Sequence, residues 1–172
     1  MADQLSEAEA ANLARHSAEG QPFPKLRYPI TNPLTSPWNL RITDVDYARL
    51  KIGHWNTDEV DDNWSIHTKT DDAGNLRSVH IVRSFRMEWY ILNLSLGEDG
   101  GAVIDSVTWD AEQHLGLKGY PGASEQAKKE AVHFCRGYLK CRFEGLPIYG
   151  KEIYDYPGCY LRKEGNGNVD ES

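Results

Sequence analysis

Residues 64–109 alternate apolar and polar side chains in four runs, and this alternation constrains the fold more than any other feature of the sequence. Side chains along a strand point to opposite faces in turn, so each run predicts one β-strand. Asp, Asn and Gly dominate the short segments 71–75 and 97–101, as hairpin turns require. We therefore expect an antiparallel β-meander of four to six strands.

A long amphipathic helix is predicted after these strands. Apolar side chains recur at helical spacing from residue 127 to residue 139, and Gly145 and Pro147 are expected to end the helix. Lys128, Lys129 and Arg136 lie away from the apolar stripe. Packing of the stripe on one face of the sheet predicts a two-layer α+β fold.

Two shorter helices and a proline-rich segment precede the sheet. Ser6 and Glu9 have the spacing of a capping box, and Thr43 can cap a second short helix that ends at Gly53. Five prolines in residues 20–37 predict an extended strap. The aromatic and aliphatic residues between the prolines favour a strap that docks on the protein surface.

These elements suggest one main domain with two extensions. We expect residues 1–37 to form the N-terminal helix and strap, residues 38–162 a single α+β domain, and residues 163–172 a disordered polar tail. A chain of 172 residues is long enough to bury one ordinary hydrophobic core.

Charge and cysteine content narrow the classes of partner and cofactor. The net charge of −7 disfavours nucleic acid and anionic membranes as partners. The first twenty residues lack the pattern of a secretion signal and no stretch is long and apolar enough to span a membrane, so we expect a cytoplasmic protein. The three cysteines lack CxxC spacing, which favours reduced, packed thiols, and no cofactor is predicted.

Arg83 is the first candidate functional residue. It alternates with Ile81 and Phe85, which places a permanent cation on an otherwise apolar strand face. A cation in such a position needs either a carboxylate partner or an anionic ligand. The candidate carboxylates are Asp61, Asp62 and Glu88.

His67 and His80 form the second candidate pair. They flank the turn at residues 71–75 at nearly equal distances, so the hairpin would place their rings opposite each other. Two imidazoles there could share acid–base chemistry or bind a metal, and the alternative is a solvated cross-strand pair. No third ligand has convincing spacing, so no metal site is predicted. The residues considered as a third ligand are His54, Asp61 and Asp62.

One local resemblance covers about a quarter of the chain. Asp62 and Trp64, followed by Arg83, Ser84 and then Tyr90, resemble a D-K-W and R-S-W strand pattern of small uncharacterised bacterial proteins. The sequence departs from that pattern at three positions: Asn63, Val82 and Phe85. The resemblance implies no activity, but it marks Asp62, Trp64, Arg83 and Ser84 as positions to test.

Two functions from different classes are compatible with these features. In the first, a sheet-lined aromatic pocket around Arg83 binds a small organic or anionic molecule, with or without cofactor-independent catalysis. In the second, the uncovered face of the sheet is a protein-interaction or dimerisation surface, and a homodimer is expected. The predicted ligand-binding residues are Arg83, Trp64, Trp89 and Ser84, and the predicted catalytic residues are His67, His80 and Asp62.

Overall fold

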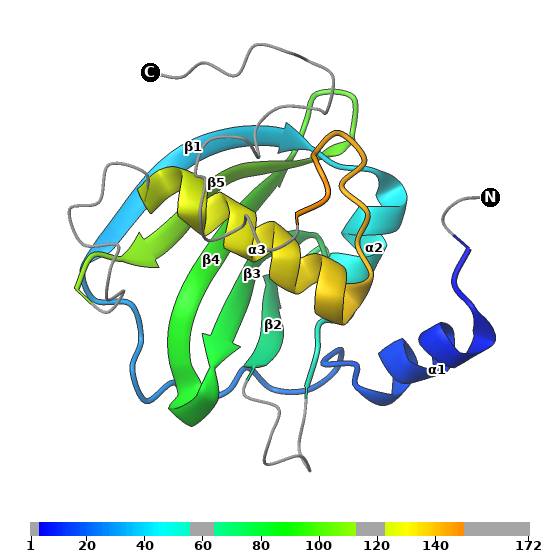
Figure 1. Ribbon diagram of the computed structural model, residues 1–172, viewed down its shortest axis with the longest axis horizontal. Helices are drawn as coiled ribbons and strands as arrows, with labels where there is room; N and C mark the ends of the chain where they lie inside the picture. Colours follow the sequence, from blue (N-terminus) through cyan, green and yellow to red (C-terminus); the bar gives the residue numbers. More distant parts are fainter. Residues whose placement is uncertain (1–3, 56–63, 113–122, 150–172) are drawn as a thin grey trace.

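The computed structural model describes residues 4–55, 64–112 and 123–149, which form an α+β fold of the predicted class (Figure 1). Five antiparallel strands make one sheet in the order β1-β5-β4-β3-β2. The strands are β1 (Pro33–Arg41), β2 (Trp64–Thr70), β3 (Leu76–Arg83), β4 (Met87–Leu96) and β5 (Ala102–Asp110). The helices are α1 (Glu7–Arg15), α2 (Asp44–Ile52) and α3 (Ala123–Leu139), with a 3-10 turn η1 (Ser84–Arg86) between β3 and β4.

The meander β2 to β5 and the helix across it confirm the main sequence prediction. Figure 1 shows α3 lying across one face of the sheet. Its apolar stripe packs there against buried strand residues such as Ile81, Tyr90 and Leu92. This face therefore contains the hydrophobic core.

Strand β1 is the element that the alternation did not reveal. It begins at Pro33, inside the segment expected to form only a strap, and pairs antiparallel with β5. Proline lacks a backbone N–H, and an edge strand tolerates it because one of its sides has no partner strand. The sheet thus runs across residue 37, where the sequence suggested the boundary between strap and domain.

The remaining strap, residues 20–32, docks on the sheet as predicted. Tyr28 forms an isolated parallel bridge with Met87. The backbone N–H of Thr31 donates to Asp110 Oδ2 at 2.8 Å, and that of Ile30 donates to Glu88 Oε1 at 3.0 Å. In Figure 1 the strap passes the ends of β2, β3 and β4 before it rises into β1.

The two short helices begin where their capping residues predict. Ser6 and Glu9 form the reciprocal capping box of α1, and the Thr43 hydroxyl accepts the backbone N–H of Asp46 at the start of α2. No helix in residues 4–55, 64–112 and 123–149 has the length and apolar character needed to cross a membrane.

Helix α3 ends earlier than predicted, at Leu139 rather than at Gly145. Lys140 takes a left-handed φ of 60°, which turns the chain out of the helix. The Asp46 carboxylate then accepts the backbone N–H groups of Arg142 and Phe143 at 2.7 and 2.8 Å. The left-handed turn at Lys140 therefore ends the helix, and the contacts with α2 hold the chain that follows it.

The polar side of α3 is less exposed than its spacing indicates. Lys129 is fully buried, and Lys128 is buried with its Nζ donating to the Pro37 carbonyl at 2.8 Å. Burial lowers the pKa of Lys128 more than the nearby Glu125 charge raises it. The Lys128 contact ties α3 to the edge strand β1.

Candidate functional site

Arg83 ends β3 and lies opposite Trp64 at the start of β2. Its guanidinium carbon is 5.8 Å from the Trp64 ring centre and 5.2 Å from the Trp89 ring centre. Both distances are within cation–π range. Arg83 is nevertheless solvent-exposed, so the three side chains form an open surface group, here called the Arg83 platform.

A β-bulge brings Trp89 into this platform. Ile81 pairs with Tyr90 while Val82 pairs with Glu88, which leaves Trp89 as an extra residue in β4. A bulge redirects the side chains on either side of it. The Trp64 ring lies 6.0 Å from the Trp89 ring and 4.2 Å from the Phe134 ring of α3, so the platform is on the helix-covered side of the sheet.

The alternation placed Arg83 on an otherwise apolar face and predicted a side chain shielded from bulk water, and this shielding is not found, because Arg83 is exposed. The strand ends at Arg83 and the 3-10 turn η1 begins at Ser84, so the alternation does not continue to residue 85. Glu88, one of the candidate partners, contacts His80 instead. Asp61 and Asp62 lie outside the described residues, and no described carboxylate forms an ion pair with Arg83. Ser84 is partly buried beside the platform.

His67 and His80 pair across β2 and β3, as their nearly equal distances from the 71–75 turn predict. Both are buried rather than solvated, because the strap residue Phe23 covers them. The Phe23 ring centre is 6.0 Å from that of His67 and 4.8 Å from that of His80. The Trp55 ring also packs edge-on against His67, at 5.1 Å.

Each histidine has a different set of hydrogen-bond partners. His67 Nε2 lies 2.9 Å from Ser65 Oγ. His80 Nε2 lies 2.7 Å from Ser78 Oγ, and its Nδ1 lies 2.7 Å from Glu88 Oε2. Glu88 therefore joins His80 to the strap, since its other carboxylate oxygen accepts the Ile30 N–H.

The protonation of these groups follows from their surroundings. Burial and, to a smaller extent, the neighbouring His80 and His54 charges together lower the pKa of His67 to about 4, so the ring is neutral at pH 7. Burial tends to raise the pKa of Glu88, but the hydrogen bonds from His80 and Ile30 outweigh it, and the net pKa is lowered. Glu88 is therefore a carboxylate at neutral pH.

The structure separates the residues that the sequence grouped into one site. Trp64 contacts the helix on one side of the sheet, whereas His67 and His80 contact the strap on the other. The histidines therefore cannot transfer protons to a molecule held by Arg83. In residues 4–55, 64–112 and 123–149, no three His, Cys, Asp or Glu side chains converge as metal ligands.

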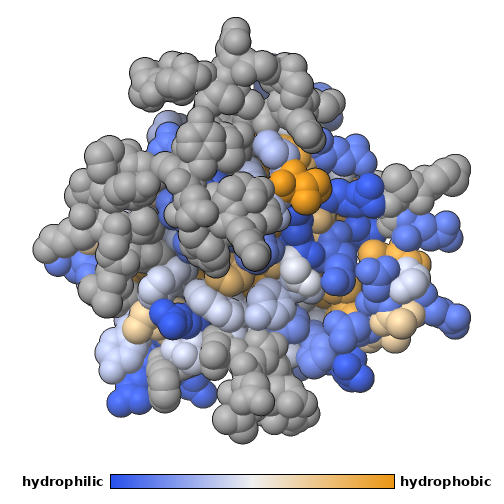
Figure 2. Space-filling model, in the orientation of Figure 1, coloured by the Kyte–Doolittle hydropathy of each residue, from blue (hydrophilic) through white to orange (hydrophobic). Residues whose placement is uncertain are grey.

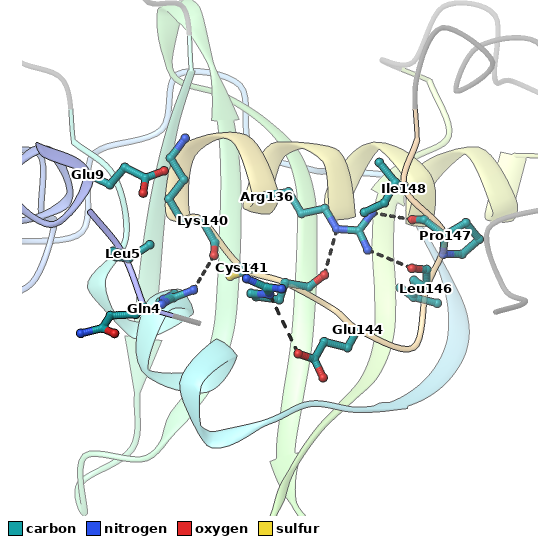
Figure 3. Close-up of a pocket in the computed structure, with 12 residues that line it drawn as sticks. Gln4, Leu5, Glu9, Arg136, Lys140, Cys141, Glu144, Leu146, Pro147 and Ile148 are labelled. Carbon is teal, nitrogen blue, oxygen red and sulfur yellow. Dashed lines mark hydrogen bonds and ion pairs between the residues drawn. The ribbon is translucent and has the colours of Figure 1, made fainter. Parts of the chain in front are cut away.

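A cavity of about 770 Å³ lies between α1, the end of α2 and the loop after α3, and sequence reasoning missed it. Figure 3 shows Arg136 pointing from α3 toward the carbonyls of this loop. Its guanidinium donates to the carbonyls of Arg142, Phe143, Leu146 and Pro147. Arg49 similarly donates to the Lys140 carbonyl at 2.7 Å. Both arginines thus stabilise the cavity wall.

On the face of the sheet that the strap contacts, the part that the strap does not cover is mainly polar. Asn93 Nδ2 donates to the hydroxyls of Ser106 and Thr108, and Thr108 also hydrogen-bonds Thr35. On the α3 side, Figure 2 shows only small, separate apolar patches among the described residues. The homodimer stays a prediction, and the apolar sheet face on which it depended is not found among the described residues.

The thiols behave as expected for packed cysteines. Cys135 and Cys141 are free and buried, and burial raises the pKa of Cys135 to about 12. They are therefore poor nucleophiles. Cys159 lies outside the described residues.

Comparison with known proteins adds no functional assignment: no family model, no curated protein and no solved structure matches this chain.

Proposed function

We propose that the protein binds a small anionic organic molecule at the Arg83 platform. The observation that carries this proposal is the exposed guanidinium of Arg83, stacked near two indole rings without a described carboxylate partner. A guanidinium that contacts aromatic faces keeps its in-plane N–H groups available for a carboxylate or phosphate.

The two indoles contribute to binding in two ways. They restrict the Arg83 side chain before a ligand arrives, which lowers the entropy cost of ordering it. Their partly exposed rings also offer apolar contact for the organic part of the ligand. The net charge of −7 would repel a large polyanion, so the proposal is restricted to small anions.

A fluorescence titration tests this proposal directly, because two of the reporting tryptophans lie in the platform. Phenyl phosphate and benzoate serve as anionic probes, and benzyl alcohol as the neutral comparison. We expect saturable quenching by an anionic probe, and at least tenfold weaker binding in Arg83→Met. Arg77→Met is the matched control, since Arg77 is an exposed arginine in the same strand.

The proposal would be contradicted by either of two results. One is the absence of saturable quenching with both anionic probes. The other is equal affinity in wild type and Arg83→Met. Circular dichroism of each variant confirms that the fold is unchanged.

A further inference from the structure

Ser78, His80 and Glu88 form a continuous hydrogen-bonded chain on the strap side of the sheet. Ser78 Oγ lies 2.7 Å from His80 Nε2, and His80 Nδ1 lies 2.7 Å from Glu88 Oε2. A hydroxyl, an imidazole and a carboxylate in this order have the connectivity of a nucleophile, a general base and an orienting group. The chain is here called the Ser78 relay.

The direction of the hydrogen bonds follows from the chemistry of the three groups. An ionised carboxylate can only accept, so His80 Nδ1 must carry the hydrogen that faces Glu88. In the neutral ring Nε2 is then an acceptor, and the Ser78 hydroxyl must donate to it. This is the tautomer that allows His80 to take a proton from Ser78.

Ser78 is the most exposed member of the relay. Glu88 and His80 are only 6% and 4% exposed, whereas Ser78 is partly exposed. A reagent could therefore reach the hydroxyl while the other two groups stay out of water. Lys69 lies opposite Ser78 in β2, and its Nζ sits 4.5 Å from the centre of the Phe23 ring. Because opposite residues of paired strands lie on the same face, Lys69 adds a positive charge to the face that contains the relay.

The neighbouring strand contains an internal comparison. Ser65 and His67 repeat the Ser-x-His spacing of Ser78 and His80, and their side chains also hydrogen-bond. No described carboxylate contacts the His67 ring. The two pairs therefore differ in the carboxylate: Glu88 holds the tautomer of the His80 ring in place, and the His67 ring has no such described partner.

We propose that the Ser78 relay performs acyl transfer from small esters, with Ser78 as the nucleophile. Ser78 Oγ attacks the ester carbonyl while His80 Nε2 takes its proton, and Glu88 stabilises the imidazolium. The proton then passes to the departing alkoxide, which leaves as an alcohol and an acyl-Ser78. Water, deprotonated by His80, attacks this ester and releases the carboxylic acid and free Ser78. This site is on the opposite side of the sheet from the Arg83 platform and does not depend on it.

The test uses a fluorophosphonate probe on the full-length protein. Attack by an activated serine on phosphorus displaces fluoride and leaves a stable phosphonate ester. Peptide mass spectrometry of the wild-type protein then identifies the modified residue without any variant. We expect modification at Ser78 and not at Ser65.

Variants separate a reactive relay from a structural one. Ser78→Ala is expected to abolish labelling at this peptide, and Ser65→Ala, the matched control, to leave it unchanged. His80→Gln and Glu88→Gln are each expected to slow labelling about 100-fold or more. Hydrolysis of p-nitrophenyl acetate should fall in Ser78→Ala and not in Ser65→Ala. Circular dichroism identifies folded variants, and only those are compared.

Three results would overturn the proposal. The first is a wild-type protein without phosphonate on Ser78, and the second is equal labelling of Ser65 and Ser78. The third is an unchanged labelling rate in folded Glu88→Gln. That result would show that the hydrogen bonds of the relay serve only to dock the strap on the sheet.

Discussion

Trp64 and Arg83 face each other across β2 and β3, but only the tryptophan packs against the core. The indole lies 4.2 Å from the Phe134 ring of α3, whereas the guanidinium is exposed to solvent. The side chain of Arg83 can therefore be altered with little effect on packing. A loss of ligand binding in an Arg83 variant can thus be separated from a loss of folding.

Arg83→Ala is predicted to destabilise the protein only slightly, by about 0.5–1 kcal/mol, because exposed cation–π contacts contribute this much. Urea denaturation of wild type and variant measures the difference. A loss of about 3–5 kcal/mol would instead indicate a buried carboxylate left without its partner.

Arg136→Met is predicted to destabilise the protein by about 2–4 kcal/mol, since it removes the donors for four carbonyls of the loop after α3. Arg136→Lys should recover little of the lost stability, because one ammonium group cannot donate to all four carbonyls in this geometry. Arg77→Met, which replaces an exposed arginine, is the control and should change stability by less than about 0.5 kcal/mol. Equal urea midpoints for the Arg136 and Arg77 variants would show that the loop does not need the guanidinium.

Two glycine substitutions are predicted to have opposite effects. Gly53 has a φ of 68°, and an added Cβ would lie 2.7 Å from the Ile66 carbonyl oxygen and 2.9 Å from Ala18 Cβ. Gly53→Ala should therefore cost about 2–3 kcal/mol. Gly137 lies within α3 with no neighbour close to an added Cβ, so Gly137→Ala should stabilise by about 0.5–1 kcal/mol. Thermal unfolding of both variants checks the signs, and a stabilised Gly53→Ala would contradict the close approach of residues 53 and 66.

His67 is predicted to make the protein less stable in mild acid. Its pKa is about 4 in the folded state against an ordinary value of 6.5, so between these values the unfolded chain binds a proton that the folded protein does not. The full free energy of unfolding is therefore available above pH 6.5, and it falls as the pH decreases toward 4. The loss between pH 7 and pH 5 should be about 2 kcal/mol.

His67→Gln should remove this part of the pH dependence while keeping a polar side chain near Ser65. His133→Gln is the control, because His133 is exposed on α3. Urea denaturation at pH 7, 6 and 5 gives the three profiles. The same slope in wild type and His67→Gln would show that the folded protein protonates His67 freely. Glu88 affects stability in a lower pH range. Because its pKa is lowered in the folded protein, its protonation reduces the free energy of unfolding only below the ordinary carboxyl value of 4.5.

Local sequence patterns were sufficient for much of the fold. The alternation in residues 64–109 predicted four strands, because the side-chain period of a strand depends only on neighbouring residues. The position of the 71–75 turn predicted that His67 and His80 pair, since a short turn determines the register of its hairpin. Ser6 and Thr43 likewise marked the helix starts.

The sequence by itself therefore determined the four strands of the meander, the starts of the two short helices and the pairing of the hairpin strands. The tertiary structure decided that residues 33–41 join the sheet as β1, and it decided what surrounds each functional side chain. The bulge that makes Trp89 the extra residue, the end of β3 at Arg83 and the strap residue Phe23 over His80 all depend on chain segments that meet only after folding. Exposure and hydrogen-bond partners are properties of those long-range contacts. A period of two along a strand assigns each side chain to a face, but it contains no information about what covers that face.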